Sequence, residues 1–210
     1  MPFADIRREY PGQPFDVAQA DPDPFHQFER WFDDARASES DPTAMTLATA
    51  APDGRPSARI VLLKGVDGGG FVFYTNYGSR KAREIDATGA ASLLFFWPSL
   101  ARQVKVSGPV ARVSAAESDA YFASRPRDSR LSVYASHQSR VIESRAALEA
   151  AFDAARRAYP DETVPRPDWW GGYRLMPDEF EFWQGRESRL HDRLQYVKTD
   201  EAWARQRLAP

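Results

Sequence analysis

Residues 44–76 constrain the fold most, because β-rich runs follow one another there with very short connections. The runs are AMTLATAA (44–51), SARIVLLKGV (57–66) and FVFYT (71–75), joined by the turn-type sequences APDGRP and DGGG. Parallel strands need a crossover of a dozen or more residues, so these runs predict antiparallel strands in a meander. A doubly wound parallel sheet is disfavoured for the same reason.

Further β-rich runs follow, so the expectation is seven or more antiparallel strands with helices inserted between them. These runs lie at 91–97, 102–113, 173–176, 179–184, 191–197 and 203–208. Gly108-Pro109 breaks the longest run, where a bulge or sharp bend fits. A mainly β fold in the form of a closed or nearly closed barrel is expected, because closure removes the exposed edges of a sheet.

Helices are predicted from caps and apolar spacing. Asp23 caps the first with Pro24 at its first position, and Asp41-Pro42 closes it. The third ends before Pro126. The second and third each begin with a serine cap and are expected at Ser79–Thr88 and Ser114–Ala123. The fourth is expected at Ser144–Tyr159 from the apolar face formed by Leu148, Phe152 and Ala155.

Composition excludes several classes of protein. The chain has 210 residues and no cysteine, which removes disulfides, thiolate nucleophiles and zinc-thiolate sites. Its net charge is −2, so no overall basic field would recruit nucleic acid. The first ten residues lack the apolar region of a signal peptide, and the longest apolar run, Leu93–Trp97, is too short to span a bilayer. We expect a soluble cytoplasmic protein without a membrane partner.

The domain organisation expected is simple. Residues 1–22 are rich in Pro, Asp and Gln and predict a mobile N-terminal arm. Residues 23–210 are expected to form a single domain, long enough to bury its own core.

No metal site and no covalent catalytic motif is expected. The histidines, His26, His137 and His191, lie far apart in the sequence. No Ser-His-Asp spacing, HExxH, GxGxxG or P-loop occurs, and the glycines at 68–70 are typical of a hairpin turn. The chemistry is therefore expected from a bound organic cofactor.

The stretch FEFWQGRESRLHDRLQY (180–196) is unusually rich in charge and aromatic rings. We interpret it as a strand pair with its turn at Gly185–Ser188. A period of two then predicts a shared face for Glu181, Trp183, Arg189, His191 and Arg193, which fits a pocket for something flat and anionic. A solvated edge hairpin with cross-strand ion pairs explains this stretch equally well.

Two cationic clusters precede it. Arg59 and Lys64 are five residues apart, so on one strand they would point to opposite faces and could serve two anions. The alternative for Lys64 is a lysine at a barrel end whose ammonium reaches water. Ser79-Arg80-Lys81 opens a helix, where backbone N–H groups and the helix dipole favour a phosphate.

Two further clusters complete the set. Arg102-Gln103 offers an amide for a ring carbonyl or nitrogen, a weak indication by itself. Tyr121 and Arg125 are spaced for one helix face, and Pro126 turns the chain so that Ser129 can rejoin them. A phenol, a guanidinium and a hydroxyl together can hold a phosphate monoester. The clusters thus predict two anion sites and a stacking pocket.

Eight motifs in this order resemble the pyridoxamine/pyridoxine 5′-phosphate oxidase family. They are RIVLLK, FYTNYGSRKA, RQVKVSGPV, YFASRPRDS, SHQS, WWGGYRL, EFWQG and RLHDR, followed by a terminal RLAP. The resemblance runs from about Arg7 to Pro210 and implies an antiparallel Greek-key split β-barrel of FMN-binding type. It also implies a homodimer with FMN at the subunit interface. Tyr134 departs from the family pattern, where a tryptophan is common, and the arm is short.

The resemblance also implies roles for individual residues. The FMN phosphate would be bound by Arg59, Arg80 and Lys81. The rest of the FMN site would be formed by Ile60, Val61, Leu62, Tyr74, Thr75, Gln103, Gln138, Ser139, Trp183 and Arg193. The substrate phosphate would be bound by Lys64, Tyr121, Arg125 and Ser129. Arg189 and His191 would lie over the substrate ring as catalytic residues, and the arm motif RREY, with Arg7 and Tyr10, would cover the substrate.

The reaction implied is the oxidation of pyridoxine or pyridoxamine 5′-phosphate to pyridoxal 5′-phosphate. A hydride would pass from C4′ to flavin N5, and oxygen would be reduced to hydrogen peroxide. A related branch that acts on phenazine precursors lacks the lysine of RIVLLK, which this chain keeps as Lys64. The alternative from another class is a carrier of FMN or vitamin B6 phosphates without oxidase activity, which has little need of Arg189 and His191. An FMN reductase would need a nicotinamide site, for which no signature is found.

Overall fold

The computed structural model describes residues 9, 10, 12–67, 69–200 and 202–210. Its helices are α1 (Pro24–Ser38), α2 (Arg80–Thr88), α3 (Ala115–Ser124), α4 (Arg127–Ala135) and α5 (Arg145–Ala158), with a 3₁₀ turn at Glu187–Arg189. Its strands are β1 (Ala44–Ala50), β2 (Pro56–Leu62), β3 (Gly65–Asp67), β4 (Gly70–Asn76), β5 (Ala90–Trp97), β6 (Arg102–Arg112), β7 (Trp170–Leu175), β8 (Glu179–Gln184), β9 (Asp192–Lys198) and β10 (Trp203–Leu208).

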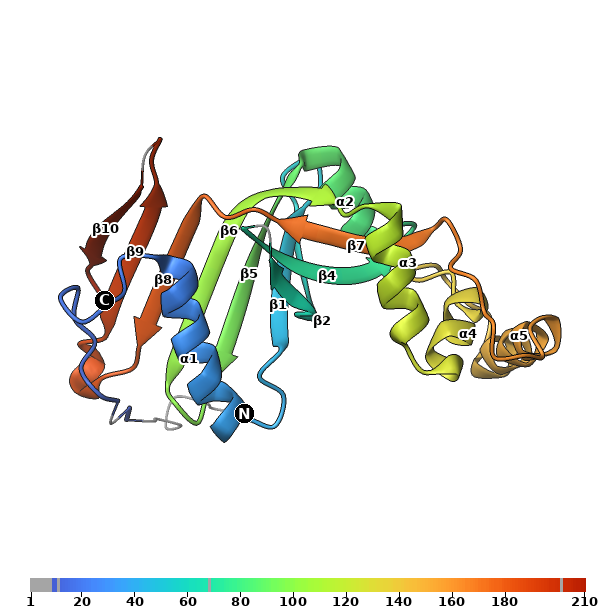
Figure 1. Ribbon diagram of the computed structural model, residues 1–210, viewed down its shortest axis with the longest axis horizontal. Helices are drawn as coiled ribbons and strands as arrows, with labels where there is room; N and C mark the ends of the chain where they lie inside the picture. The colour runs from blue at the N-terminus through green and yellow to red at the C-terminus, as the bar shows by residue number, and fades with distance from the viewer. Residues whose placement is uncertain (1–8, 11, 68, 201) are drawn as a thin grey trace.

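The described strands join in one curled antiparallel sheet (Figure 1). The order is β10-β9-β8-β6-β5-β1-β2, and β7, β4 and β3 branch from β6. β6 pairs with β8 up to Ser107 and with β7 from Val110, so the strand changes partner at Gly108-Pro109, where the sequence predicts a bend. The mainly β, antiparallel prediction is confirmed.

The strand register shows which residues share a face of the sheet, because directly opposed residues on neighbouring strands point to the same side. One row across four strands is buried and consists of Phe95, Val104, Phe182 and Leu194. The adjacent row points to the opposite face and consists of Phe96, Gln103, Trp183 and Arg193. Phe96 in this second row is 48% exposed. The sheet therefore has one core face and one open face.

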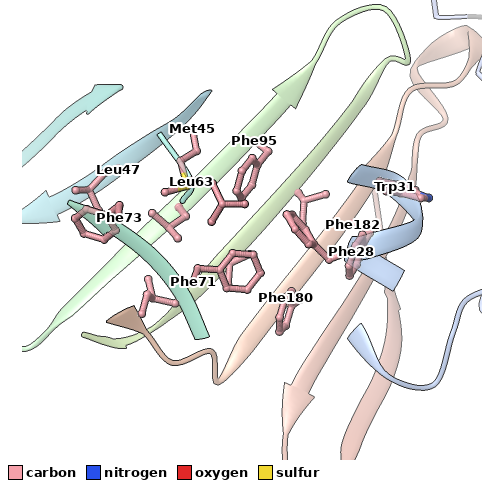
Figure 2. Packing of buried hydrophobic residues seen from close by; sticks show 14 of the residues in the cluster. Phe28, Trp31, Met45, Leu47, Leu63, Phe71, Phe73, Phe95, Phe180 and Phe182 are labelled. Atoms are coloured by element: carbon pink, nitrogen blue, oxygen red, sulfur yellow. The ribbon is translucent and has the colours of Figure 1, made fainter. Parts of the chain in front are cut away.

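Helix α1 covers the core face. Asp23 accepts from the Phe25 N–H and caps the helix, with Pro24 at its start, as predicted. Trp31 packs edge-on against Phe182 with ring centroids 5.2 Å apart (Figure 2). Phe28 packs in the same way against Phe71 at 4.9 Å. Full burial of each such ring contributes about 2–3 kcal/mol, so these contacts fix the helix on the sheet.

Helices α3, α4 and α5 form a second unit at the end of the sheet away from β8–β10 (Figure 1). Phe122, Leu131, Ala155 and Trp170 pack together there. Helix α4 is absent from the sequence prediction, which treats Pro126 only as a stop. Pro126 ends α3 and directly precedes α4, since proline tolerates the first positions of a helix. Among the described residues, no helix is long and apolar enough to cross a membrane.

Residues 57–66 form two strands instead of the single run predicted. At Leu63 the backbone N–H bonds to Thr43 on the β1 side, whereas the Lys64 N–H bonds to Val72 of β4. The chain thus changes partner between these residues, which ends β2 at Leu62 and starts β3 at Gly65. The prediction that Arg59 and Lys64 point to opposite faces of one strand is wrong, because Lys64 lies beyond the end of that strand.

The connection between β8 and β9 is also longer than the turn predicted at Gly185–Ser188. It spans 185–191 and includes the 3₁₀ turn. Ser188 and Arg189 both have positive φ, 54° and 61°, so these residues, and not Gly185, take the left-handed conformation. The prediction that Arg189 shares a strand face with Trp183 is therefore wrong.

The described part of the predicted arm is packed against the last two strands. Phe15 is buried, and its N–H donates to the Asp192 carboxylate at 3.1 Å. The Tyr196 hydroxyl donates to the Asp21 carbonyl at 2.8 Å. Closure of the arm as a lid stays a prediction.

Candidate active site

A cavity of about 1270 Å³ lies between β2, β4, the start of α2 and the helices α3–α5. It brings together thirteen of the residues predicted for the cofactor and substrate. They are Arg59, Ile60, Val61, Leu62, Lys64, Tyr74, Thr75, Arg80, Lys81, Tyr121, Arg125, Gln138 and Ser139. The geometry thus joins segments that are up to 80 residues apart in the sequence.

Lys81 lies at one end of the cavity, in the first turn of α2. The helix begins as predicted, with Ser79 as its cap. The Lys81 ammonium donates to Gln138 Oε1 at 2.8 Å and to Thr75 Oγ1 at 3.2 Å, both neutral acceptors. Burial, and then the nearby Arg59 charge, lower the pKa of Lys81 to about 8. A buried ammonium with neutral partners at a helix N-terminus favours an anion.

Two arginines flank the same helix end and share one carboxylate. Arg80 Nε donates to Glu84 Oε1 at 2.7 Å, and Arg59 Nη2 lies 3.5 Å from Glu84 Oε2. Arg59 also donates to Thr49 Oγ1 at 2.6 Å and to the Leu47 carbonyl at 3.1 Å. Most donors of Arg59 are therefore engaged by the barrel, whereas the Arg80 side chain is 55% exposed along the cavity.

Arg125 lies at a separate position in the cavity, directly after α3. Its guanidinium sits 4.8 Å from the Trp170 ring centroid, and its buried Nη1 has no hydrogen-bond partner among the described residues. Burial lowers its pKa. The Tyr121 ring, from the same helix, stacks on Tyr74 at 3.8 Å. A half-buried guanidinium whose buried Nη1 is an unused donor is a strong site for an anionic group.

The predicted partner Ser129 lies on α4, and its carbonyl accepts from Ser132 Oγ at 2.9 Å. Within the described part of the chain, Ser132 lines the cavity and Ser129 does not. Lys64 is exposed and lines the cavity together with Arg59, so the loop after β2 brings both cations to one space.

A second cluster of predicted residues lies on the open face of β6, β8 and β9, outside the described lining of the cavity. Gln103 lies opposite Trp183, which lies opposite Arg193. Arg193 donates to Glu181 at 2.8 Å. Figure 1 shows β8 and β9 toward the other end of the long axis from α3–α5, with β6 between them and the rest of the sheet.

His191 belongs to this second cluster. Its ring centroid is 4.6 Å from that of Trp183, and its Nδ1 accepts from the Arg186 N–H at 3.0 Å. A nitrogen that accepts carries no proton, so the neutral ring has its proton on Nε2. Burial, and then the charge of Arg189, lower the pKa of His191.

The arm reaches the same cluster. The Tyr10 ring meets Trp183 edge-on at 5.7 Å and His191 at 6.0 Å. A side chain at Gly185 would place its Cβ 2.7 Å from the Tyr10 Cβ, so glycine is required for this close approach. The prediction for Arg7 lies outside the described residues.

The sequence prediction missed two residues that shape the cavity. Glu84 binds both arginines, and its only sequence signal is the i, i+4 spacing to Arg80. Trp170 stacks parallel to Tyr121 and lies beneath Arg125. The glycines after it carry a signal: a side chain at Gly172 would meet the Tyr74 ring at 2.8 Å, so β7 can approach the cavity only without one.

Comparison with known proteins accounts for nearly the whole chain. Residues 32–158 match the family described as pyridoxamine 5′-phosphate oxidase, and residues 170–210 match the pyridoxine 5′-phosphate oxidase C-terminal dimerisation region. The chain belongs to the pyridoxamine 5′-phosphate oxidase family. This confirms the resemblance carried by the eight sequence motifs.

Relatives in this family cover almost the full length. The pyridoxine/pyridoxamine 5′-phosphate oxidase of Rubrobacter xylanophilus is 56% identical over 209 residues, 99% of this chain and 96% of the relative. That of Burkholderia multivorans is 56% identical over 212 residues, 99% of each chain. This member of the pyridoxamine 5′-phosphate oxidase family is therefore an enzyme, an oxidoreductase.

Solved structures confirm the split-barrel fold. PhzG from Burkholderia lata, solved with tetrahydrophenazine-1-carboxylic acid, superposes with a TM-score of 0.88 at 33% identity, over 95% of this chain and 99% of PhzG. A pyridoxamine 5′-phosphate oxidase-related, FMN binding protein from Nostoc punctiforme gives a TM-score of 0.73 at 20% identity, over 90% and 98%. At that identity the second likeness concerns the fold alone.

Proposed function

We propose that the protein is an FMN-dependent oxidase that converts pyridoxine or pyridoxamine 5′-phosphate to pyridoxal 5′-phosphate. The observation that carries the proposal is a pair of cations in one cavity, the buried Lys81 and the half-buried Arg125, whose Nη1 is buried. Within the described ranges neither of them forms an ion pair with a carboxylate. Two phosphorylated ring systems, one cofactor and one substrate, would provide the two missing anions.

The residues present fit FMN at the α2 end of the cavity. Lys81 and Arg80, with the N–H groups of the first turn, would bind the phosphate, and Arg59 would add charge from the barrel. Ile60 and Leu62 on β2 are exposed at 63% and 40% and offer apolar contact for the flavin ring. Tyr74, Thr75, Gln138 and Ser139 line the same part of the cavity.

The substrate phosphate would be bound at Arg125, with Lys64 and Tyr121, which line the same cavity, whereas the predicted Ser129 lies outside its described lining. Arg125 is held over Trp170 by a cation–π contact, which orients its guanidinium before the ligand arrives. Lys64 is exposed and can reach the ligand by a change of rotamer. Contacts of this kind fix the substrate ring in position, which can supply several kcal/mol of the barrier.

We further propose that a homodimer completes the site. Gln103, Trp183, His191 and Arg193 are predicted site residues, yet they lie on the open sheet face, away from the cavity. The match of 170–210 to a dimerisation region supports a partner on this face. A second copy would then bring this cluster against the cavity of the first, as a two-fold interface allows.

When bound, FMN supplies hydride acceptance at N5 and passes the electrons to oxygen, which yields hydrogen peroxide. The chain's own groups bind and orient the substrate. Arg189 would orient the substrate ring and stabilise the negative charge that hydride transfer moves away from the substrate, and His191, with its Nε2–H, would donate a hydrogen bond to the ring. Arg7 and Tyr10 on the arm would exclude water. We place this activity in the cytoplasm.

Oxygen uptake by the purified yellow protein tests the proposal. Either phosphorylated vitamer should be consumed with formation of hydrogen peroxide and pyridoxal 5′-phosphate. The absorbance of pyridoxal 5′-phosphate measures the product. Binding of both ligands without oxygen uptake would favour the carrier of FMN or vitamin B6 phosphates instead. The fold shared with PhzG makes tetrahydrophenazine-1-carboxylic acid, the compound bound to PhzG, the appropriate control, and oxidation of that compound alone would contradict the proposal.

A further inference from the structure

Glu84 is the one carboxylate of the described chain that contacts both Arg59 and Arg80. It lies in α2 and is 5% exposed. Its Oε2 accepts from the hydroxyls of Ser57 and Thr49, each at 2.5 Å, and its Oε1 accepts from Arg80 Nε at 2.7 Å. The carboxylate therefore connects the helix to β1 and β2.

Glu84 stays ionised under all ordinary conditions. Burial by itself would raise the pKa of this carboxyl, but the hydrogen bonds from Ser57, Thr49 and Arg80 outweigh burial and lower the pKa to about 2. A buried charge is costly unless it is paired and hydrogen-bonded. Here four donors meet that condition, so the carboxylate is a fixed part of this end of the cavity.

The contact to Arg80 has a defined geometry. Only Nε of Arg80 is bound by Glu84, in the i, i+4 arrangement on α2. Binding at Nε fixes the plane of the guanidinium and leaves its two terminal nitrogens for other partners along the cavity. An unrestrained arginine loses side-chain entropy when it binds a ligand. The contact with Glu84 already restricts the Arg80 side chain, so binding a ligand costs less entropy.

The net charge of the groups around the Glu84 carboxylate also matches that of a dianion in magnitude, with the opposite sign. Arg59, Arg80 and Lys81 carry +3 and Glu84 carries −1, which leaves +2 at the start of α2. A phosphate monoester carries a charge of about −1.5 to −2 near neutral pH. Without Glu84 the three cations would repel one another in a half-buried space.

We propose that Glu84 is a positioning residue that orients Arg80 and Arg59 for the phosphate of a flavin nucleotide. The inference rests on the proposed function, because it takes FMN as the occupant of the α2 end of the cavity. Glu84 acts through the arginines and does not touch the phosphate itself. Its role is to strengthen the binding of a flavin that carries a phosphate relative to one that does not.

Flavin affinity of the apoprotein tests the proposal without any turnover. Dissociation constants for FMN and for riboflavin, which lacks the phosphate, are measured by quenching of flavin fluorescence. Glu84→Ala should raise the constant for FMN about tenfold and leave the riboflavin constant unchanged within twofold, as expected for loss of one charge-assisted contact. Glu84→Gln should raise the FMN constant about threefold, because one amide oxygen can still accept from Ser57 and Thr49.

Two further variants distinguish the positioning of Arg80 from a general effect of removing negative charge near the cavity. Glu149→Ala removes a carboxylate that also lines the cavity but that, among the residues the structure describes, pairs with the exposed Arg145 alone, and it should match the wild type. In an Arg80→Ala background, Glu84→Gln should add less to the FMN constant than it does alone, because coupled residues are not additive.

The results that overturn the proposal are distinct. Equal weakening of FMN and riboflavin would mean a purely structural role. Unchanged or tighter FMN binding would mean that repulsion of the phosphate outweighs orientation. If Glu84→Ala does not fold, the FMN and riboflavin dissociation constants of Glu84→Gln are judged in the same way. A wild type that binds FMN no better than riboflavin would instead refute the phosphate site, and with it the proposed function.

Discussion

Lys81 Nζ donates a hydrogen bond to Gln138 Oε1 at 2.8 Å, which joins the first turn of α2 to the segment after α4. Two cofactor-binding residues predicted from separate motifs thus contact each other directly. The amide oxygen is a neutral acceptor and leaves the ammonium charge unbalanced. A phosphate beside this pair would supply the balancing charge.

Lys81 should make the proposed binding of FMN depend on pH. The pKa is lowered to about 8 in the folded apoprotein and stands at 10.5 ordinarily, so the unfolded chain binds more protons between these values. The free energy of unfolding of the apoprotein should therefore rise with pH in this window. FMN binds the ammonium form, so its dissociation constant should rise about three- to tenfold between pH 7.5 and 9. Fluorescence titrations check this, and a Lys81→Met variant that kept the same slope would refute the assignment.

Arg125→Ala should mainly raise KM for the phosphorylated substrate. The phosphate contact is the same in ground and transition states, so KM should rise about tenfold or more with kcat nearly unchanged. FMN affinity should be unaffected, because Lys81 and Arg80 lie at the other end of the cavity. Steady-state kinetics with both vitamers measure the effect. A fall in kcat with unchanged KM would place Arg125 outside the substrate phosphate site.

Arg189→Ala should lower kcat by about tenfold or more while FMN stays bound, since a positioned cation acts on charge that develops during the reaction. The residue has a φ of 61°, so alanine there also carries some backbone strain. Arg189→Gly removes that strain and is the matched control. Turnover by either variant at the wild-type rate, with a normal flavin spectrum, would remove Arg189 from the mechanism.

His191 should titrate below its ordinary pKa of 6.5, because burial and the charge of Arg189 disfavour the imidazolium. Its Nδ1 accepts from the Arg186 N–H, and protonation there would bring two donors together. The folded state binds fewer protons than the unfolded one below pH 6.5, so this group adds stability as pH rises through that window. Nitrogen-detected NMR should show the Nε2–H tautomer at pH 7. The Nδ1–H tautomer would contradict the hydrogen bond.

The sequence predicted the helix starts that are stabilised by contacts between residues close together in the chain. Ser79 and Ser114 cap their helices by hydrogen bonds to the third residue beyond, a pattern readable from spacing alone. The missed features depend on tertiary partners. The break after β2 arises because Leu63 and Lys64 bond to different strands, and no residue type there marks it.

The site was predictable in its residue types and less so in its arrangement. The sequence identified Lys81 and Arg125 as anion-binding residues, and both line one cavity. Glu84 was missed because its partners Thr49 and Ser57 lie on strands, at sequence distances that no motif connects. Arg189 was misplaced because period-two spacing assumes a strand, whereas the chain forms a 3₁₀ turn there.

In the proposed homodimer, the cavity of one subunit and the open-face cluster of its partner form each active site. Lys81→Met disables the first half. Arg189→Ala disables the second, because Arg189 lies two residues before His191 in the connection between β8 and β9. Mixed dimers from co-expression of these two chains, purified by two different tags, should contain one intact and one doubly altered site. We expect about half of wild-type activity per mixed dimer, from two variants that are each nearly inactive as homodimers. Activity no higher than that of the two parents would show that each site lies within one chain and would contradict the account.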